Sequence, residues 1–246
     1  LSSAASDVYK RQPQDFGERY SRQTMMPQIG AEGQRRLLNA RVLVIGAGGL
    51  GSPLLLYLCA AGVGTLGICD PDKVSLSNLQ RQVLYTTADL GEPKTAIAER
   101  RLKEINPNVS LNLYPEAFTA ANAREIAKGY DLIADCCDNF TTRYLIDDVC
   151  AEAGIPWVHG AIQEMRGQLA VFNWRKGKRL TDIFPDRGYL CSLPTVTHGV
   201  AGPVPGAIGS LQACEVMKII TGCGTPCEGR LFTIDFDKLT TENIHF

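Results

Sequence analysis

The side chains that could perform chemistry begin at a glycine-rich turn, GAGGLGS, which spans residues 46–52. A continuous apolar run at residues 42–45 leads into the turn, and a helix-like stretch at residues 50–61 follows it. Such a unit lets backbone N–H groups approach a phosphate, which the positive end of the helix also attracts. We therefore expect a nucleotide to bind at Gly46, Gly48, Gly49 and Gly51. A glycine turn without a ligand is the alternative.

An acidic and polar block follows the next apolar run, residues 66–69. Asp70 stands at the distance where an acidic residue contacts the ribose of a bound nucleotide. The block continues as DPDKVSLSNLQRQ to residue 82, just beyond a strand end, where open parallel sheets bind ligands. The further residues that we expect to bind the nucleotide are Asp72, Ser77, Asn78, Gln80, Arg81 and Gln82.

Two cations distinguish this pattern from an ordinary NAD or FAD site. A dehydrogenase has no need of Arg81 and Lys94 near a triphosphate, whereas transfer at the α-phosphate of ATP needs positive groups that stabilise the transition state. Lys94 also falls in the first turn of the helix expected at residues 93–105, where it opposes the helix dipole and calls for a nearby anion. We therefore expect ATP, with Arg81 and Lys94 as catalytic residues.

A carboxylate for Mg²⁺ follows the apolar run at residues 132–136. Asn139 can cap the helix expected at residues 141–153, which leaves Asp138 free to bind Mg²⁺ together with phosphate oxygens. We count Asp138 as catalytic and place both residues in the nucleotide site. Two other functions stay open: an NAD-dependent oxidoreductase, for which only His159 and His198 are candidate acid/base groups, and a non-catalytic nucleotide-binding regulator.

The elements that must position these residues indicate an α/β fold. The apolar runs at residues 42–45, 66–69 and 132–136 are typical of strands buried on both faces of a parallel sheet. Further strands are expected at 109–114 and 157–160, and helices at 32–39, 120–128 and 205–221. Residues 167–174 alternate and turn the sheet towards an antiparallel extension, with a late strand at 231–236. The sequence predicts a Rossmann-like, doubly wound, mainly parallel sheet with an antiparallel extension in its C-terminal half.

The order of these motifs resembles the ThiF/MoeB/HesA family of ubiquitin-activating-enzyme-like adenylyltransferases. The glycine turn, the DxDxVxxSNLQRQ block, the Pro93-Lys94 pair and the DCxDN turn carry the resemblance, which runs from about Phe16 to about Thr233. It implies ATP-dependent adenylation of the C-terminal glycine carboxylate of a small ubiquitin-like sulfur carrier protein that ends in Gly-Gly, with release of pyrophosphate. The implied pathways are thiamine, molybdopterin or related sulfur chemistry.

The resemblance assigns two further residues. The segment RYSRQ matches one that reaches into the ATP site of a partner subunit, which implies a homodimer with Arg22 acting in trans. The active-site cysteine of the family falls at Thr195 here, four residues before Gly199. Cys191 lies in the same expected loop, residues 186–200, and could have taken the role of the sulfur-transfer thiol.

The family usually carries two CxxC pairs that bind structural zinc, and this chain departs from that pattern. Arg179 and Asp182 stand where the first pair belongs. Cys223 and Cys227 are spaced one residue wider than a usual zinc knuckle and have no partner pair. We expect no zinc, as in a divergent branch of the family.

Composition sets the remaining limits. The net charge of −1 offers no basic surplus for nucleic acid or an anionic membrane, and no apolar run reaches the roughly 20 residues of a membrane helix. Nine cysteines, several within apolar runs, indicate free thiols in a reducing cytoplasm. Residues 2–12 back-translate to a string that looks like a sequencing-library adapter, so we interpret residues 1–12 as translated adapter and residues 13–246 as a single domain.

Overall fold

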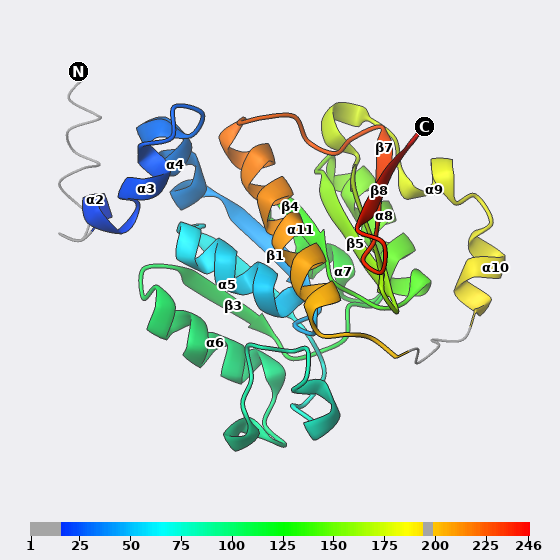
Figure 1. Cartoon of the computed structure of the whole chain (residues 1–246), viewed down its shortest axis with the longest axis horizontal. Coiled ribbons are helices and arrows are strands. Elements are labelled where there is room, and N and C mark those ends of the chain that lie inside the picture. Colours follow the sequence, from blue (N-terminus) through cyan, green and yellow to red (C-terminus); the bar gives the residue numbers. More distant parts are fainter. Residues whose placement is uncertain (1–15, 194–198) are drawn as a thin grey trace.

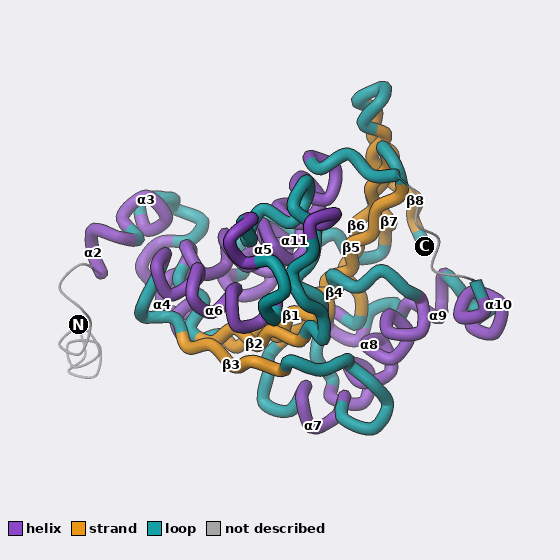
Figure 2. The backbone as a smooth tube through the Cα atoms, turned by 90° about the horizontal axis from the view of Figure 1, so that it is seen from below, coloured by secondary structure: helices purple, strands orange, loops and turns teal. Residues whose placement is uncertain are grey.

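The computed structural model describes residues 16–193 and 199–246, which form one eight-stranded sheet with helices on both faces (Figures 1 and 2). The strand order is β3-β2-β1-β4-β5-β6-β7-β8. The strands are β1 (Arg41–Ile45), β2 (Thr65–Cys69), β3 (Ser110–Tyr114), β4 (Leu132–Asp135), β5 (Trp157–Gln163), β6 (Arg166–Phe172), β7 (Arg230–Asp235) and β8 (Thr240–His245).

The first five strands in chain order are parallel, which confirms the expected doubly wound sheet. β1 pairs in parallel with β2 on one side and β4 on the other, so that Ile45 lies opposite both Cys69 and Asp135. Strand order therefore reverses between β1 and β4. In open parallel sheets this switch point forms the crevice, outside the carboxyl ends of the strands, where ligands bind.

The antiparallel extension is also confirmed and contains one more strand than the sequence predicts. β5 pairs antiparallel with β6, β6 with β7, and β7 with β8. All six residues of β8 are exposed. A strand with neither face buried lacks the apolar alternation by which strands are recognised, and this explains why β8 was missed.

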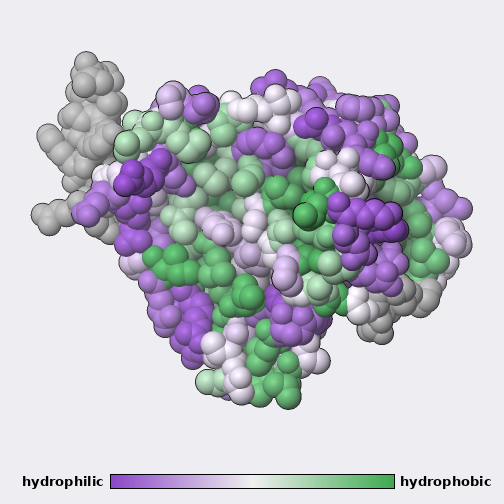
Figure 3. Space-filling view, viewed as in Figure 1, coloured by the Kyte–Doolittle hydropathy of each residue, from purple (hydrophilic) through white to green (hydrophobic). Residues whose placement is uncertain are grey.

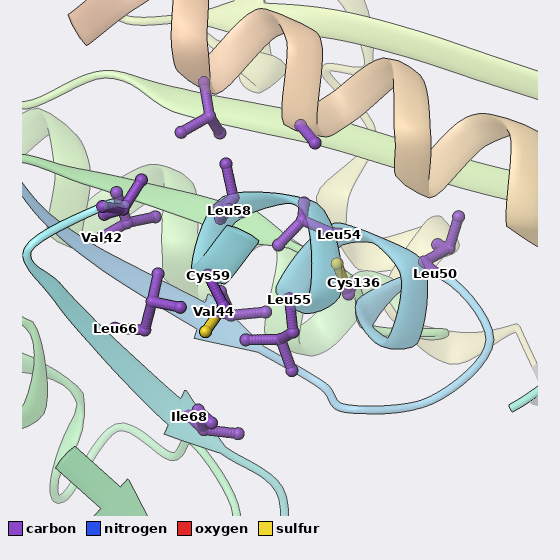
Figure 4. Packing of buried hydrophobic residues seen from close by; sticks show 14 of the residues in the cluster. Val42, Val44, Leu50, Leu54, Leu55, Leu58, Cys59, Leu66, Ile68 and Cys136 are labelled. Atoms are coloured by element: carbon purple, nitrogen blue, oxygen red, sulfur yellow. The ribbon is translucent and has the colours of Figure 1, made fainter. Parts of the chain in front are cut away.

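The sheet divides two hydrophobic layers, each covered by its own helices. One face carries α4 (Gly30–Asn39), α5 (Gly51–Ala61), α6 (Lys94–Ile105) and α11 (Pro203–Thr221), and the other carries α7 (Ala123–Ala127) and α8 (Phe140–Ala153) (Figure 2). Side chains alternate along β1. Val42 and Val44 pack with α5 (Figure 4), whereas Leu43 and Ile45 belong to the cluster on the side of α7 and α8.

Several short helices precede these elements or lie in the connections between them. They are α2 (Phe16–Arg19), α3 (Ser21–Thr24), α9 (Leu180–Ile183) and α10 (Arg187–Ser192), with 3₁₀ turns η1 (Leu76–Asn78), η2 (Thr87–Asp89) and η3 (Trp174–Lys176). The expected loop at residues 186–200 therefore begins as a helix, which Asp186 caps by accepting the N–H of Tyr189. Thr195 and His198 lie outside the described residues, as does the segment interpreted as adapter. Among the helices described, none combines the length and apolar character needed to cross a membrane.

Candidate active site

The glycine turn connects β1 to α5 and lies against the end of β4. Gly46 has a φ of +97°, and a Cβ there would approach the carbonyl oxygen of Cys136 to 2.6 Å. A Cβ at Gly51 would lie only 2.1 Å from the carbonyl oxygen of Gly46. Only glycine fits these two positions, because the turn packs on the neighbouring backbone. The N-terminus of α5 thus faces the crevice between β1 and β4.

Two side chains hold Ala47, in the middle of the turn. Asp70 Oδ2 accepts the N–H of Ala47 at 2.7 Å, and the Tyr85 hydroxyl donates to the Ala47 carbonyl at 2.8 Å. Burial raises the pKa of Asp70, while the nearby charge of Lys94 opposes that rise. The sequence predicts Asp70 at the nucleotide but gives no signal for Tyr85, which lies three residues beyond the DxDxVxxSNLQRQ motif.

The polar block forms an excursion, residues 74–92, between β2 and α6. A bridge between Lys73 and Pro93 closes its base. The excursion returns to the glycine turn, because a Cβ at Gly49 would lie 3.5 Å from Arg81 Cγ. Gln82 approaches in the same way, since a Cβ at Gly48 would lie 3.4 Å from its Nε2. The structure therefore brings Arg81 and Gln82 to the turn, as the sequence predicts.

Two other polar residues of the excursion, Ser77 and Asn78, shape it through their backbone carbonyls. The Ser77 carbonyl accepts from Arg81 Nη1 at 3.1 Å, and the Asn78 carbonyl accepts the N–H groups of Arg81 and Gln82. Gln80 Nε2 donates to the carbonyl of Val200 at 3.4 Å. Ser77 and Asn78 thus orient the loop that carries Arg81, while Gln80 contacts the segment that enters α11.

Lys94 is the first residue of α6 and is buried beside two carboxylates. Its Nζ lies 2.8 Å from Asp72 Oδ2 and 3.9 Å from Asp70 Oδ1. The side chain of Asp70 is 6% exposed, whereas that of Asp72 is 64% exposed. These anions balance a lysine that would otherwise oppose the dipole of α6. The anion expected near Lys94 is therefore present within the protein itself.

Asp138 is presented on the turn that joins β4 to α8. Asn139 Oδ1 accepts the N–H of Thr142 at 2.8 Å, which confirms it as the cap of α8. Asp138 is exposed, and its Oδ1 accepts a hydrogen bond from the Asn139 side-chain amide at 3.3 Å. Within the described part of the chain no cation pairs with its carboxylate, so the oxygen ligands that Mg²⁺ prefers are free on the β4 side of the crevice.

Two predicted residues lie away from the crevice in a single chain. Arg22 is exposed on α3, and the adjacent Gln23 donates to the carbonyl of Ala61 at the C-terminal end of α5. The 11 residues of α5 span about 16 Å, so Arg22 lies at the end of this helix opposite the glycine turn. Cys191, on α10, is partly buried against the cluster that contains Tyr144, and both views place α10 at the edge of the molecule (Figures 1 and 2).

The cysteine thiols and the histidine imidazole nearest to the glycine turn are poorly suited to act as nucleophiles or as acid/base catalysts. Burial raises the pKa of Cys136 and of Cys137 well above the usual thiol value, so both stay protonated. His159 is 2% exposed, its Nδ1 lies 3.0 Å from Asp135 Oδ2, and burial lowers its pKa. Because it is almost fully buried, His159 is shielded from a substrate that binds at the crevice, and this makes it a poor acid/base group for hydride transfer.

The residues at the expected zinc positions have other contacts. Arg179 Nη2 lies 2.9 Å from both Asp147 Oδ2 and Asp148 Oδ1 on α8, and Asp182 accepts the N–H of Arg179 at 2.8 Å. Cys227 is buried and donates its N–H to Glu215. Across the described residues, no group of three or more histidine, cysteine or acidic side chains is arranged to hold a metal ion.

Comparison with known proteins gives one consistent result. The profile of the ThiF family matches residues 20–246. The sulfur carrier protein adenylyltransferase of Thermus thermophilus is 46% identical over 234 residues, which cover 91% of this chain and 86% of that protein. The probable adenylyltransferase/sulfurtransferase MoeZ of Mycobacterium tuberculosis is 45% identical over 232 residues, which cover 92% of this chain but only 59% of that longer protein.

The solved structures support the same fold. A crystal structure of selenomethionine PaaA superposes with a TM-score of 0.82 at 24% sequence identity, and the match covers 96% of this chain and 75% of that one. At this level of identity the likeness concerns the fold alone.

Proposed function

The chain belongs to the ThiF family, and from this premise we propose that it adenylates the C-terminal glycine carboxylate of a small ubiquitin-like sulfur carrier protein. One observation carries the proposal. The glycine turn packs against Cys136, two residues before Asp138, and lies beside Arg81. Asp70, which holds the turn, also lies beside buried Lys94. That set suits a triphosphate whose α-phosphate is attacked. The names of the relatives, which describe adenylyltransferases of sulfur carriers, support the same reaction.

The residues present fit ATP. The phosphates would lie along the glycine turn at the positive end of α5, and Asp70 would bind the ribose. Three buried side-chain polar atoms among the described residues have no hydrogen-bond partner, and two of them, Ser52 Oγ and Gln82 Oε1, belong to residues at this turn. Unsatisfied buried groups of this kind are what a polar ligand can satisfy.

The residues also fit Mg²⁺, which Asp138 would hold together with phosphate oxygens. A magnesium ion bound there supplies positive charge that neutralises the phosphates. Asn139 does not compete for this task, because its side chain caps α8. Asp138 therefore contributes a carboxylate that is held by the fold and paired with no other cation of the described chain.

In the proposed reaction a carboxylate oxygen of the carrier bonds to the α-phosphorus of ATP. The bond from that phosphorus to the bridging oxygen breaks, and pyrophosphate leaves with the electron pair. The nucleophile arrives ionised, so the protein needs no general base. Arg81 and Lys94 supply positive charge to the pentacovalent phosphorus, and the glycine turn aligns the nucleotide. The product is an acyl-adenylate, which is competent for sulfur transfer.

We propose that the active form is a homodimer in which Arg22 serves the crevice of the other copy. In its own chain, Arg22 lies about one helix length from the glycine turn. Its neighbours Met25 and Met26 are 70% and 45% exposed, and Leu76 and Val83 of the excursion are 69% and 64% exposed. Figure 3 shows apolar side chains at the foot of the view, where Figure 1 places the excursion. Large exposed apolar side chains near a charged residue suit a protein contact.

The later sulfur step is also part of the proposal. Cys191 is the thiol assigned to it, and α10 would have to leave its place on α8 for Cys191 to reach the acyl-adenylate. A thiamine, molybdopterin or related sulfur pathway would supply the carrier. A reducing cytoplasm fits the nine free cysteines, all of which lie in the described part of the chain. Neither nucleic acid nor a membrane is a proposed partner.

ATP–pyrophosphate exchange tests the proposal. Exchange should appear with MgATP only when a small carrier ending in Gly-Gly is present, and MgATP should raise the melting temperature more than NAD does. If NAD raises the melting temperature and no carrier supports exchange, the result favours an NAD-dependent oxidoreductase over an adenylyltransferase. If MgATP binds but no carrier supports exchange, the chain is a nucleotide-binding regulator.

A further inference from the structure

Four polar side chains from four elements meet directly behind the turn that carries Asp138. They are Asp135 of β4, Arg143 of α8, His159 of β5 and Gln212 of α11, and they are 0%, 6%, 2% and 0% exposed, respectively. Nothing in the adenylation reaction uses them. Burying four such groups in one place has a large desolvation cost, so their arrangement calls for a physical explanation.

Two members of this cluster, Asp135 and Arg143, contact Cys137, the residue immediately before Asp138. Asp135 Oδ1 accepts the N–H of Cys137 at 3.1 Å, and Arg143 Nη2 donates to the Cys137 carbonyl at 3.0 Å. Arg143 Nε also donates to Asp135 Oδ2 at 3.0 Å. Both backbone polar groups of Cys137 are therefore held by a buried ion pair, which leaves the following residue little freedom.

Gln212 fixes the same turn from the other face of the sheet. Its Nε2 donates to the carbonyl of Asp135 at 2.6 Å and to that of Val158 at 3.3 Å. A Cβ at Gly160 would lie 2.3 Å from the Gln212 side chain, so α11 reaches this point only because β5 has glycine there. The end of β4 is thus held from α8 below and from α11 above.

Stability alone does not account for this arrangement. A buried ion pair is often no more stabilising than apolar side chains of similar volume, whereas it does impose a specific geometry. Asp138 itself is exposed and has no strong partner in the described chain. Its direction is therefore set by the backbone that Arg143, Asp135 and Gln212 hold.

We propose that Arg143 and Gln212, acting through Asp135, are positioning residues that aim the carboxylate of Asp138 at the metal of the bound nucleotide. This proposal rests on the proposed function, because it takes Asp138 as the Mg²⁺ ligand. Groups that orient a metal ligand without touching the metal commonly contribute 10- to 100-fold to metal affinity. His159 completes the set by occupying the remaining side of Asp135 Oδ2.

The test measures the affinity of Mn²⁺, as the probe, for the protein saturated with AMP-PCP, a non-hydrolysable ATP analogue. Free Mn²⁺ is followed by electron paramagnetic resonance. Arg143→Lys keeps a cation beside Asp135 but loses the bond to the Cys137 carbonyl. We expect its Mn²⁺ dissociation constant to rise about tenfold, while its affinity for AMP-PCP in EDTA changes by less than about twofold.

Arg179→Lys is the matched control. Arg179 pairs with Asp147 and Asp148 further along α8, so the substitution disturbs a more exposed ion pair on the same helix that does not touch the turn. We expect it to leave Mn²⁺ affinity unchanged. If Arg143→Lys is unfolded by circular dichroism, Gln212→Met takes its place, because it removes the bond to the Asp135 carbonyl.

Asp138→Asn separates failure of this proposal from failure of the function. If Asp138→Asn weakens Mn²⁺ binding and Arg143→Lys does not, the positioning role is overturned while Asp138 keeps its metal. If Asp138→Asn leaves Mn²⁺ binding unchanged, Asp138 is not the ligand and the positioning role falls with it. An equal loss of Mn²⁺ affinity in Arg143→Lys and Arg179→Lys would show general loosening of α8, and would also overturn it. These conclusions depend on Mn²⁺ affinities alone, so they hold whether or not the protein catalyses carrier-dependent exchange.

Discussion

Replacing Lys94 with methionine should separate its structural role from its catalytic role. Methionine keeps the apolar stem but removes the charge. The lysine Nζ lies 3.9 Å from Asp70 Oδ1 and 2.8 Å from Asp72 Oδ2. Asp72 is mostly exposed and can turn to water, whereas Asp70 is buried and would keep an unbalanced charge. The structural loss therefore falls on Asp70.

The size of that loss follows from the geometry. Removing one partner of a fully buried ion pair costs about 3–5 kcal/mol. Here the buried pair is longer than a hydrogen bond, and Asp70 keeps the N–H groups of Ala47 and Asp72, so we expect about 2–4 kcal/mol. For a protein of this size that corresponds to a fall in melting temperature of about 5–15 °C. The catalytic loss should be about 10²- to 10³-fold in the exchange rate, the usual effect of deleting one charge-stabilising donor.

The assay compares exchange rates at saturating ATP and carrier with melting temperatures. In Lys94→Met/Asp70→Asn the neutral amide no longer needs a cation, so the melting temperature should recover in part. Exchange should nevertheless stay about 100-fold below that of Asp70→Asn alone, because the positive charge at the phosphates is still missing. Lys103→Met, at the exposed end of the same helix, is the control for loss of a lysine from α6.

Two results would refute this account of Lys94. If the double variant matched Asp70→Asn in exchange, Lys94 would serve only to balance Asp70. A second refuting result is an Lys94→Met protein with an unchanged melting temperature, because the buried carboxylate would then not need its cation. Nucleotide affinity must be measured in parallel, since an equal loss of affinity and rate would indicate a lysine that only binds the ground state.

Three further predictions test neighbouring features. Tyr85→Phe leaves the buried Ala47 carbonyl without its hydrogen-bond donor and should weaken ATP binding about fivefold, as measured by titration calorimetry. Unchanged affinity would contradict the idea that Tyr85 holds the glycine turn in its binding geometry. Cys191→Ser should leave carrier-dependent exchange within a few-fold of the parent, since adenylation uses no thiol, and a large loss in folded protein would oppose this. Burial lowers the pKa of His159 in the folded protein, so as the pH falls the imidazole is protonated in the unfolded state first. The free energy of unfolding should therefore fall as the pH drops below about 6.5, by up to about 1.4 kcal/mol per pH unit. Denaturant titrations should show this fall reduced in His159→Gln but not in His245→Gln, whose side chain is exposed.

The sequence predicts the sheet and the glycine turn because both depend on local patterns. Buried parallel strands are continuous apolar runs, and the carboxyl ends of such strands meet at one edge. That rule predicts that Asp70, Arg81 and Asp138 lie near one another. The structure keeps Asp70 and Arg81 at the turn through contacts with Ala47 and Gly49.

What the sequence could not predict depends on long-range packing. Gln212 meets the carbonyl of Asp135 across 77 positions of the chain, and Tyr85 meets Ala47 across 38. No residue spacing encodes such pairs. Glutamine in an amphipathic helix and tyrosine in a polar loop are ordinary, so neither stands out until the layers are packed. The exposed strand β8 was missed for the opposite reason, because nothing buries either of its faces.

The two sides of the crevice present opposite charges, a lysine on one side and a carboxylate on the other, and this affects how ATP would bind in the proposed site. On the α6 side the lysine charge is already balanced by Asp70 and Asp72, while on the β4 side Asp138 forms no ion pair with a described cation and interacts with the buried Arg143 only through space. A triphosphate can draw Lys94 from exposed Asp72 at little cost, because water then solvates that carboxylate. Drawing it from buried Asp70 would be costly. The geometry therefore favours a small shift of the lysine that keeps Asp70 paired, so that the carboxylate can go on holding the glycine turn while the nucleotide binds.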